Sequence, residues 1–278
     1  MEERMLREKY EHLAAIVRGL GSVAVAFSGG VDSTFLLKVA HDVLEERALA
    51  ITATSSFFPR RETDEASAFC EEEGIRQLLC PSGVLGVKDI RRNPRNRCYL
   101  CKRALFEKLC AMAKENHLAH VAEGSNMDDN GDYRPGMQAI AELGIRSPLR
   151  EAGLWKQDIR ELSREMGLPT WDKPSFACLA SRFPYGEEIS KEKLYMVERA
   201  EQFLLERGFR QIRVRIHGKM ARIEALPEDF GRFLQGEFRE EILKKFREVG
   251  FQYVSMDLQG YRTGSMNEVL QHDISAEI

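Results

Sequence analysis

Short apolar runs alternate with amphipathic stretches through the first part of the chain. The apolar runs predict buried strands over 22–28, 48–56 and 120–126. Between and around them, the 3.6-residue spacing of apolar positions predicts helices over 2–19, 32–46, 59–74, 101–115 and 155–167. Strands that alternate with helices predict an α/β fold, in which helices cover both faces of a parallel sheet.

The pattern changes after about residue 185. A long helix is expected over 190–208, followed by two strands with strict apolar–polar alternation, a helical stretch and a last strand (210–218, 220–226, 228–248 and 251–259). We therefore expect two domains, an α/β domain over 1–185 and a small α+β domain over 186–278.

Composition narrows the class of protein. The net charge of −3 gives no overall basic field that would attract nucleic acid. The N-terminal residues are charged and no apolar run approaches the roughly 18 residues of a membrane span, so neither a signal peptide nor a membrane segment is expected. The expected compartment is the cytoplasm, where the six cysteines serve as thiols, metal ligands or catalysts rather than as disulfides.

The sequence "FSGGVDS" (27–33) follows the first strand and opens a helix. Gly29 and Gly30 permit a tight turn with consecutive exposed N–H groups, and the helix N-terminus adds partial positive charge. Ser28 and Ser33 add hydroxyl groups, so the loop suits a pyrophosphate. It is neither a Walker A loop nor GxGxxG. A plain strand-to-helix turn with a Ser or Asp cap is the alternative.

A second polar loop, "EGSNMDDNGDYRPG" (123–136), follows the third predicted strand. Gly124, Ser125 and Asn126 suit a close approach to a nucleotide. Asp128 and Asp129 offer carboxylate oxygens, the ligands that Mg²⁺ prefers. The alternative is an Asx-rich loop that caps the next helix.

Three cysteines stand in distinctive surroundings. Cys98 and Cys101 form a CxxC within the basic stretch "RNRCYLCKR", which fits half a zinc site, a redox pair, two ligands of a cluster, or no site. Cys178 lies in "WDKPSFACLASRFPYG", where Lys173 and Arg182 offer cations for a thiolate. The alternative for Cys178 is that it is a small buried hydrophobic residue without a chemical role. We interpret Cys70, Cys80 and Cys110 as helix or core cysteines.

The "SGGVDS" segment resembles the PP-loop of the N-type ATP pyrophosphatases, the adenine nucleotide alpha hydrolase-like fold. The resemblance implies cleavage of ATP between its α and β phosphates and transfer of AMP to an acceptor oxygen, with Mg²⁺ as cofactor. It implies that the nucleotide site includes Ser28, Gly29, Gly30, Asp32, Ser33, Gly124, Ser125, Asn126 and Asp128. By position after the second strand, Thr54 and Ser55 are further candidates that would line the adenosine, and a polar strand end is the alternative for both.

The wider set of motifs, "SGGVDS", "RCYLCKRALF", "GSNMDDNGDYRPG", "RSPLREAGL" and "WDKPSFACLASRFPYGE", resembles the LarE family. Those sulfur transferases build the nickel-pincer nucleotide cofactor of lactate racemase. The resemblance implies that ATP adenylates a carboxylate of a pyridinium-3,5-dicarboxylate mononucleotide and that sulfur then displaces AMP to leave a thiocarboxylate. Cys178, Asp32 and Arg182 are the implied catalytic residues.

The family has two branches that differ in the source of sulfur. In one, a cysteine that matches Cys178 gives up its own sulfur. In the other, three cysteines hold a [4Fe–4S] cluster with a bound sulfide. Cys98, Cys101 and Cys178 favour the cluster branch, while zinc or a redox pair stays an alternative for the CxxC.

The resemblance also bears on partners. It implies a homo-oligomer, in which five charged residues would contribute to a substrate phosphate or metal site near a subunit contact, or simply be solvated: Glu201, Arg213, Arg215, Glu224 and Asp229. A tRNA thiolation enzyme is a competing hypothesis, supported by the basic stretch 85–103 but opposed by the net charge. An amide synthetase would need an ammonia source, and no glutaminase domain is evident. We expect neither a nucleic-acid nor a membrane partner.

Overall fold

The computed structural model describes residues 2–129, 135–262 and 264–265. It divides into two compact units. The first comprises residues 1–86 and 96–176, and the second comprises residues 87–95 and 177–278. No helix in the described part of the chain is long and apolar enough to cross a membrane.

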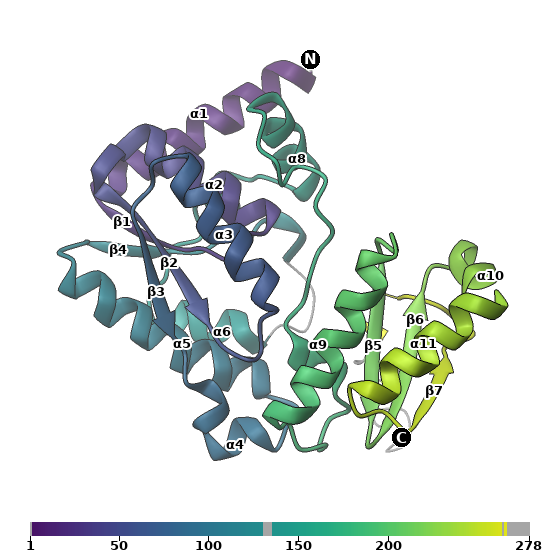
Figure 1. The fold of residues 1–278 in the computed structure, drawn as a ribbon. Coiled ribbons are helices and arrows are strands. Elements are labelled where there is room, and N and C mark those ends of the chain that lie inside the picture. The colour runs from purple at the N-terminus through teal and green to yellow at the C-terminus, as the bar shows by residue number, and fades with distance from the viewer. Residues whose placement is uncertain (1, 130–134, 263, 266–278) are drawn as a thin grey trace, which may run out of the picture. The chain divides into compact units, whose positions relative to one another are not determined.

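The first unit is built on a four-stranded parallel sheet in the order β3-β2-β1-β4 (Figure 1). The strands are β1 (Val23–Ala26), β2 (Ala48–Thr54), β3 (Gln77–Pro81) and β4 (His120–Ala122). The helices are α1 (Glu2–Leu20), α2 (Val31–Leu44), α3 (Arg60–Glu72), α5 (Arg97–Glu115), α6 (Pro135–Glu142), α7 (Pro148–Glu151) and α8 (Lys156–Glu165).

Side-chain alternation along β1 separates the two core layers of this unit. Val23 and Val25 face one layer, which receives side chains from α1, α2, α3, α7 and α8. Ala24 faces the other layer, which receives α5 and α6. The parallel sheet is therefore covered on both faces, which confirms the α/β fold predicted from the sequence.

The second unit contains a three-stranded sheet in the order β5-β6-β7. Its strands are β5 (Ile212–His217), β6 (Met220–Ala225) and β7 (Tyr253–Met256), and its helices are α4 (Lys88–Arg91), α9 (Lys191–Glu206), α10 (Phe230–Phe233) and α11 (Gly236–Glu248). β5 and β6 form the expected antiparallel hairpin, and β7 pairs with β6 in parallel. The additional small α+β unit is thus present.

Several predicted elements were wrong in their bounds. α5 begins at Arg97 rather than at 101, so the CxxC lies in the first turns of a helix. The helical stretch expected over 228–248 is interrupted between α10 and α11, at Leu234 and Gln235. β3, α4, α6 and α7 were not predicted. β3 is a half-exposed edge strand, and the other three are at most eight residues long, so each has a weak apolar pattern.

Candidate functional site

Three polar loops meet at the carboxyl edge of the parallel sheet. The glycine loop follows β1, residues 54–56 follow β2, and the 123–129 loop follows β4. β1 lies between β2 and β4. The chain therefore continues from β1 to β2 and β3 on one side of β1, and it then crosses to β4 on the other side. Ligands of open α/β sheets bind at such a switch point, outside the carboxyl ends of the strands.

The glycine loop has the backbone of an anion cradle. Gly29 has φ +70°, and a Cβ there would lie 3.2 Å from the Ala66 Cβ. Gly30 is the N-cap of α2 and has no side chain to cap the helix. The first N–H groups of a helix have no intrahelical acceptor, so those of α2 are available to an anion.

Hydroxyl groups brace the ends of this loop. The Ser28 and Ser33 Oγ atoms lie 3.0 Å apart, and Ser33 Oγ donates to the Gly30 carbonyl at 3.2 Å. Ser33 Oγ also accepts from the Ser28 N–H at 3.3 Å. These contacts hold the turn in shape before any ligand binds, and they leave the backbone N–H groups of Gly29 and Gly30 unused by the hydroxyls.

The 123–129 loop packs directly on the glycine loop. A Cβ on Gly124 would lie 3.1 Å from both the Ser33 backbone nitrogen and the Asp32 Cβ. Asn126 Nδ2 donates to Asp32 Oδ1 at 3.2 Å, and Lys156 Nζ, from the first residue of α8, contacts Asp32 Oδ2. Asp32 therefore joins the glycine loop, the 123–129 loop and α8.

Other carboxylates hold the 123–129 loop itself. Asp129 Oδ2 accepts from the Asn126 N–H at 2.9 Å, and Asp128 Oδ2 accepts from the Lys156 N–H at 2.7 Å. Glu123 accepts from the Ser125 hydroxyl at 2.7 Å. Asp128 uses one of its two oxygens in this way, so its donor set fits a single carboxylate ligand to a nucleotide-bound Mg²⁺. Residues 130–134 of this motif lie outside the described part of the chain.

The residues after β2 contact their own neighbours. The Thr54 carbonyl accepts from the Ser82 N–H at 3.0 Å, and Ser55 Oγ accepts from the Phe57 N–H at 3.1 Å. Both residues are half-buried at the same sheet edge as the glycine loop. This position is compatible with the adenosine-lining role expected for them.

Lys156 and Lys173 contact the glycine loop, and the sequence pattern did not assign either of them there. Lys173 Nζ donates to the Gly29 carbonyl at 3.0 Å and pairs with Glu62 (2.7 Å) and Glu65 (2.6 Å) of α3. Both lysines come from segments more than a hundred residues after the loop. The periodicity of apolar residues gives no indication of such contacts. The sequence offers one clue, which is that Lys156 closely follows the motif "RSPLREAGL" and Lys173 lies within "WDKPSFACLASRFPYG".

Cys98 and Cys101 lie in the first turns of α5, and Cys98 is exposed while Cys101 is half-buried. Residues three apart on a helix share a face, with Cβ atoms roughly 5–6 Å apart. Arg97 Nη2 lies 3.6 Å from Cys98 Sγ. Two thiols on one helical face beside arginine form a donor pair that suits two ligands of a cluster.

The other cysteines of the first unit, Cys70, Cys80 and Cys110, lie in or against its hydrophobic core. Burial raises the pKa of the Cys70 thiol to about 12 and also raises the pKa values of Cys80 and Cys110. All three belong to core layers or pack against them, as the sequence predicted.

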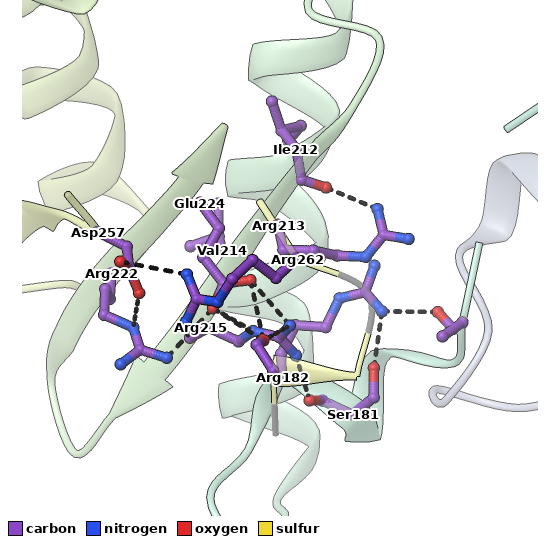
Figure 2. A network of polar contacts seen from close by, with 12 residues as sticks. Ser181, Arg182, Ile212, Arg213, Val214, Arg215, Arg222, Glu224, Asp257 and Arg262 are labelled. Carbon is purple, nitrogen blue, oxygen red and sulfur yellow. Dashed lines mark hydrogen bonds and ion pairs between the residues drawn. The ribbon is translucent and has the colours of Figure 1, made fainter. Parts of the chain in front are cut away.

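Cys178 lies in the second unit, immediately before the 3₁₀ helix η4 (Leu179–Arg182), and is half-buried. Beside it, alternate residues of β5 and β6 place arginine and glutamate side chains on one side of the sheet (Figure 2). Arg182 pairs with Glu201, and Arg215 pairs with Glu224. Arg222 and Arg262 both approach Asp257, at 3.6 and 3.7 Å.

Burial dominates the electrostatics of this layer. Burial alone would lower the pKa of Arg182, but Glu201 holds it above its ordinary value. Burial would likewise raise the pKa of Glu201, which Arg182 holds below its usual range. Burial and then the charge of Arg182 lower the pKa of Arg213. Asp229, the last of the five charged residues predicted for this unit, pairs with Arg232 within its own turn at 3.0 Å.

Within the described residues, no three His, Cys, Asp or Glu side chains come together as a metal site. Cys98 and Cys101 belong to the first unit, and Cys178 belongs to the second.

The fold and the loop geometry define the class of protein first. The four-stranded parallel sheet with a glycine-rich anion cradle is that of the PP-loop enzymes. Consistent with this, the chain is 25% identical over 181 residues to one subunit of the glutamine-hydrolysing GMP synthase of Thermococcus kodakarensis, covering 61% of this chain and 58% of that protein. No family model matches the chain.

Two relatives match the chain over nearly their full length. The chain is 38% identical over 266 residues to the pyridinium-3,5-bisthiocarboxylic acid mononucleotide synthase of Lactiplantibacillus plantarum, which covers 95% of this chain and 96% of that protein. It is 44% identical to an uncharacterized protein of Synechocystis, over 96% of this chain and 99% of that protein. The chain belongs to the family of pyridinium-3,5-bisthiocarboxylic acid mononucleotide synthases, and it is an enzyme.

Proposed function

We propose that this enzyme uses ATP to adenylate a carboxylate of pyridinium-3,5-dicarboxylate mononucleotide and converts it to a thiocarboxylate. The observation that carries the proposal is the glycine loop, braced by Ser28 and Ser33 and joined through Asp32 to the 123–129 loop. The near full-length similarity to a synthase of the bisthiocarboxylic acid mononucleotide supports the choice of substrate.

The first step is adenylation. A substrate carboxylate oxygen attacks the α-phosphorus of ATP, and pyrophosphate leaves into the N-terminal cradle of α2. We propose that the loop N–H groups of Gly29 and Gly30 take the charge that develops on the leaving pyrophosphate. Asp128 would hold Mg²⁺, which neutralises the phosphates when bound.

The second step is sulfur transfer. A sulfur nucleophile attacks the acyl carbon, the bond to AMP breaks, and the thiocarboxylate remains. We propose that Cys98, Cys101 and Cys178 supply three thiolate ligands to a [4Fe–4S] cluster, the number that leaves one iron open. When bound, such a cluster would supply the transferred sulfide, and reduced thiols match the cytoplasmic location expected from the sequence.

The chain itself ties Cys178 to the segment that contacts the glycine loop. Lys173 is fixed to the Gly29 carbonyl, and the Phe176 ring lies 5.0 Å from the Arg61 guanidinium of α3. Cys178 follows Phe176 by two residues, so their Cα atoms are at most about 7 Å apart. This covalent constraint supports a role for Cys178 in the step that follows adenylation.

A cationic layer suits the phosphate of the mononucleotide. Arg213, Arg222 and Arg262 lie in this part of the second unit, where Arg222 and Arg262 share one carboxylate, Asp257, and Arg213 lies over the Tyr261 ring. These guanidinium groups support recognition of a phosphorylated substrate. A homo-oligomer of this chain, expected from the sequence, belongs to the same proposal.

The test measures AMP and pyrophosphate release by anaerobically purified enzyme with ATP, Mg²⁺ and the dicarboxylate mononucleotide. The proposal predicts release that depends on the mononucleotide and a thiocarboxylate product of matching amount. ATP turnover that ignores the mononucleotide would contradict it. Salt-dependent retention of tRNA would instead support the tRNA thiolation alternative.

Iron and acid-labile sulfide assays separate the two sulfur sources. A [4Fe–4S] centre predicts about four of each per chain, and Cys98→Ala then abolishes transfer. In the alternative, Cys178 attacks the acyl carbon and its Cβ–S bond breaks by elimination, which leaves dehydroalanine. Iron-free protein that is active once, loses the mass of H₂S at Cys178 and tolerates Cys98→Ala would show that alternative.

A further inference from the structure

The turn that carries Cys178 is held by an unusual number of donors to its backbone carbonyls. The Cys178 carbonyl accepts from the Ser181 N–H (3.0 Å), the Ser181 hydroxyl (2.8 Å) and Arg182 Nη1 (3.1 Å). Arg182 Nη1 also donates to the Ala177 carbonyl at 2.7 Å. Both peptide groups that flank the Cys178 Cα are therefore fixed.

Arg182 is anchored in turn by the core of the second unit. Its side chain is 1% exposed, and its Nε and Nη2 atoms contact the two oxygens of Glu201 at 2.9 and 2.8 Å. Glu201, on α9, also accepts from the Val214 N–H of β5 at 2.8 Å. The cysteine turn is thereby tied to a helix and a strand through one planar guanidinium.

Arg215, which follows Val214 on β5, also pairs with a glutamate and donates to a carbonyl of the turn (Figure 2). Its Nε and Nη2 atoms contact Glu224 at 3.0 and 2.8 Å, and its Nη1 donates to the Ser181 carbonyl at 2.6 Å. In both buried arginine–glutamate pairs, Nε and Nη2 of the arginine contact the carboxylate, and Nη1 donates to a carbonyl of the 177–181 turn. Together, Arg182, Glu201, Arg215 and Glu224 form a carbonyl clamp.

Stability alone is a poor explanation for two such pairs. Apolar side chains of similar volume replace a buried ion pair at little cost or with a gain in stability. Bidentate guanidinium–carboxylate geometry instead fixes direction, since both groups are planar and both oxygens are used. The geometry therefore favours a role in placing the turn.

We propose that the carbonyl clamp positions the sulfur-bearing Cys178 for transfer, with Arg182 and Arg215 as positioning residues. The inference rests on the proposed function of Cys178 in sulfur transfer. It predicts that loss of the clamp uncouples the two steps, because adenylation at the glycine loop continues while the sulfur nucleophile is misplaced. A displacement of about 1 Å lowers a reaction rate about 100-fold.

The test variant carries Arg182→Met together with Glu201→Met, which removes both charges and leaves neither buried alone. The matched control carries Arg207→Met with Glu241→Met, an exposed pair of the same type in the same unit. Three quantities are measured: the melting temperature, the thiocarboxylate formed per pyrophosphate released, and amide hydrogen exchange across 177–182. The test variant should melt near or above the wild type, exchange faster at Ser181, and form about 100-fold less thiocarboxylate per pyrophosphate.

Unchanged exchange or an unchanged product ratio in the test variant would overturn the inference, as would an equal fall of that ratio in the control. If the double variant fails to fold, Ser181→Ala decides, because it removes one donor to the Cys178 carbonyl and leaves both ion pairs intact. An unchanged ratio in Ser181→Ala then counts against the clamp. Wild-type enzyme that releases no pyrophosphate with the mononucleotide would refute the proposed function instead, while the exchange measurement still tests the clamp.

Discussion

Lys173 donates a hydrogen bond from Nζ to the backbone carbonyl of Gly29 at 3.0 Å. The contact joins a segment near the end of the first unit to the middle of the glycine loop, and Glu62 and Glu65 hold the same ammonium group. The lysine side chain is 14% exposed. Lys173 therefore helps to set the loop conformation that presents the N–H groups of α2 to an anion.

Lys173→Met is expected to raise the KM for ATP about tenfold, because a hydrogen bond to a charged group is worth about 1.5–3 kcal/mol. Lys9→Met is the matched control, since Lys9 pairs with Asp158 in the same unit and does not touch the loop. Steady-state pyrophosphate release at varied ATP measures the effect. An equal KM in the wild type and Lys173→Met would show that the contact has no role in nucleotide binding.

Gly124→Ala tests the packing of the 123–129 loop on the glycine loop. The added methyl group would lie 3.1 Å from the Ser33 nitrogen and the Asp32 Cβ, so one loop has to move. We expect weaker ATP binding, by about tenfold for a cost near 1.4 kcal/mol. Gly19→Ala is the control, because no atom lies within 4 Å of its added Cβ. Calorimetric titration with ATP that gives equal affinities for both variants would count against the packing role.

Thiol reactivity should separate the cysteines by environment. At pH 8, iodoacetamide should modify Cys98 first, since its side chain is exposed, and Cys70 last, since burial raises its pKa to about 12 and only the thiolate reacts. Peptide mass spectrometry of metal-free native protein follows the order of modification. Early modification of Cys70 would mean that the core around α3 opens readily.

The Arg182–Glu201 pair predicts acid sensitivity in the second unit. Arg182 holds the pKa of Glu201 below its usual range despite the opposing effect of burial. The stabilisation is therefore present above the unfolded pKa of about 4.3 and is lost as the pH falls through the lower folded value. Denaturant unfolding between pH 7 and 3 should show a steeper loss in the wild type than in Arg182→Met with Glu201→Met. Parallel profiles would contradict this assignment.

The sequence predicted the α/β sheet and the glycine loop because both depend on local pattern. Val23 and Val25 alternate with Ala24 in a run too short for a helix, and the two glycines mark the turn that follows. The links between distant segments were not predictable in this way. The bonds from Lys156 to Asp32 and from Lys173 to Gly29 depend on tertiary packing. The periodic pattern of apolar residues does not report such packing between distant segments.

The same limit applies to the arginines of the second unit. Alternation predicted the β5–β6 hairpin, and it places Arg213 and Arg215 on one side of the sheet. It gave no indication that Arg215 pairs with Glu224 and donates to the Ser181 carbonyl. Arg182 was expected to offer a cation to the Cys178 thiolate, and the charge of Cys178 is among the influences that raise the Arg182 pKa. Its contacts with Glu201 and with the carbonyls of the turn were not predicted.

The most direct test of the account is the number of thiocarboxylate groups formed per enzyme chain, counted by mass spectrometry under anaerobic conditions with ATP, the dicarboxylate mononucleotide and added sulfide. ATP-dependent sulfur transfer from a replenished source predicts more than one thiocarboxylate per chain, with one AMP released for each. AMP released without any thiocarboxylate, or no reaction that depends on the mononucleotide, would contradict the account.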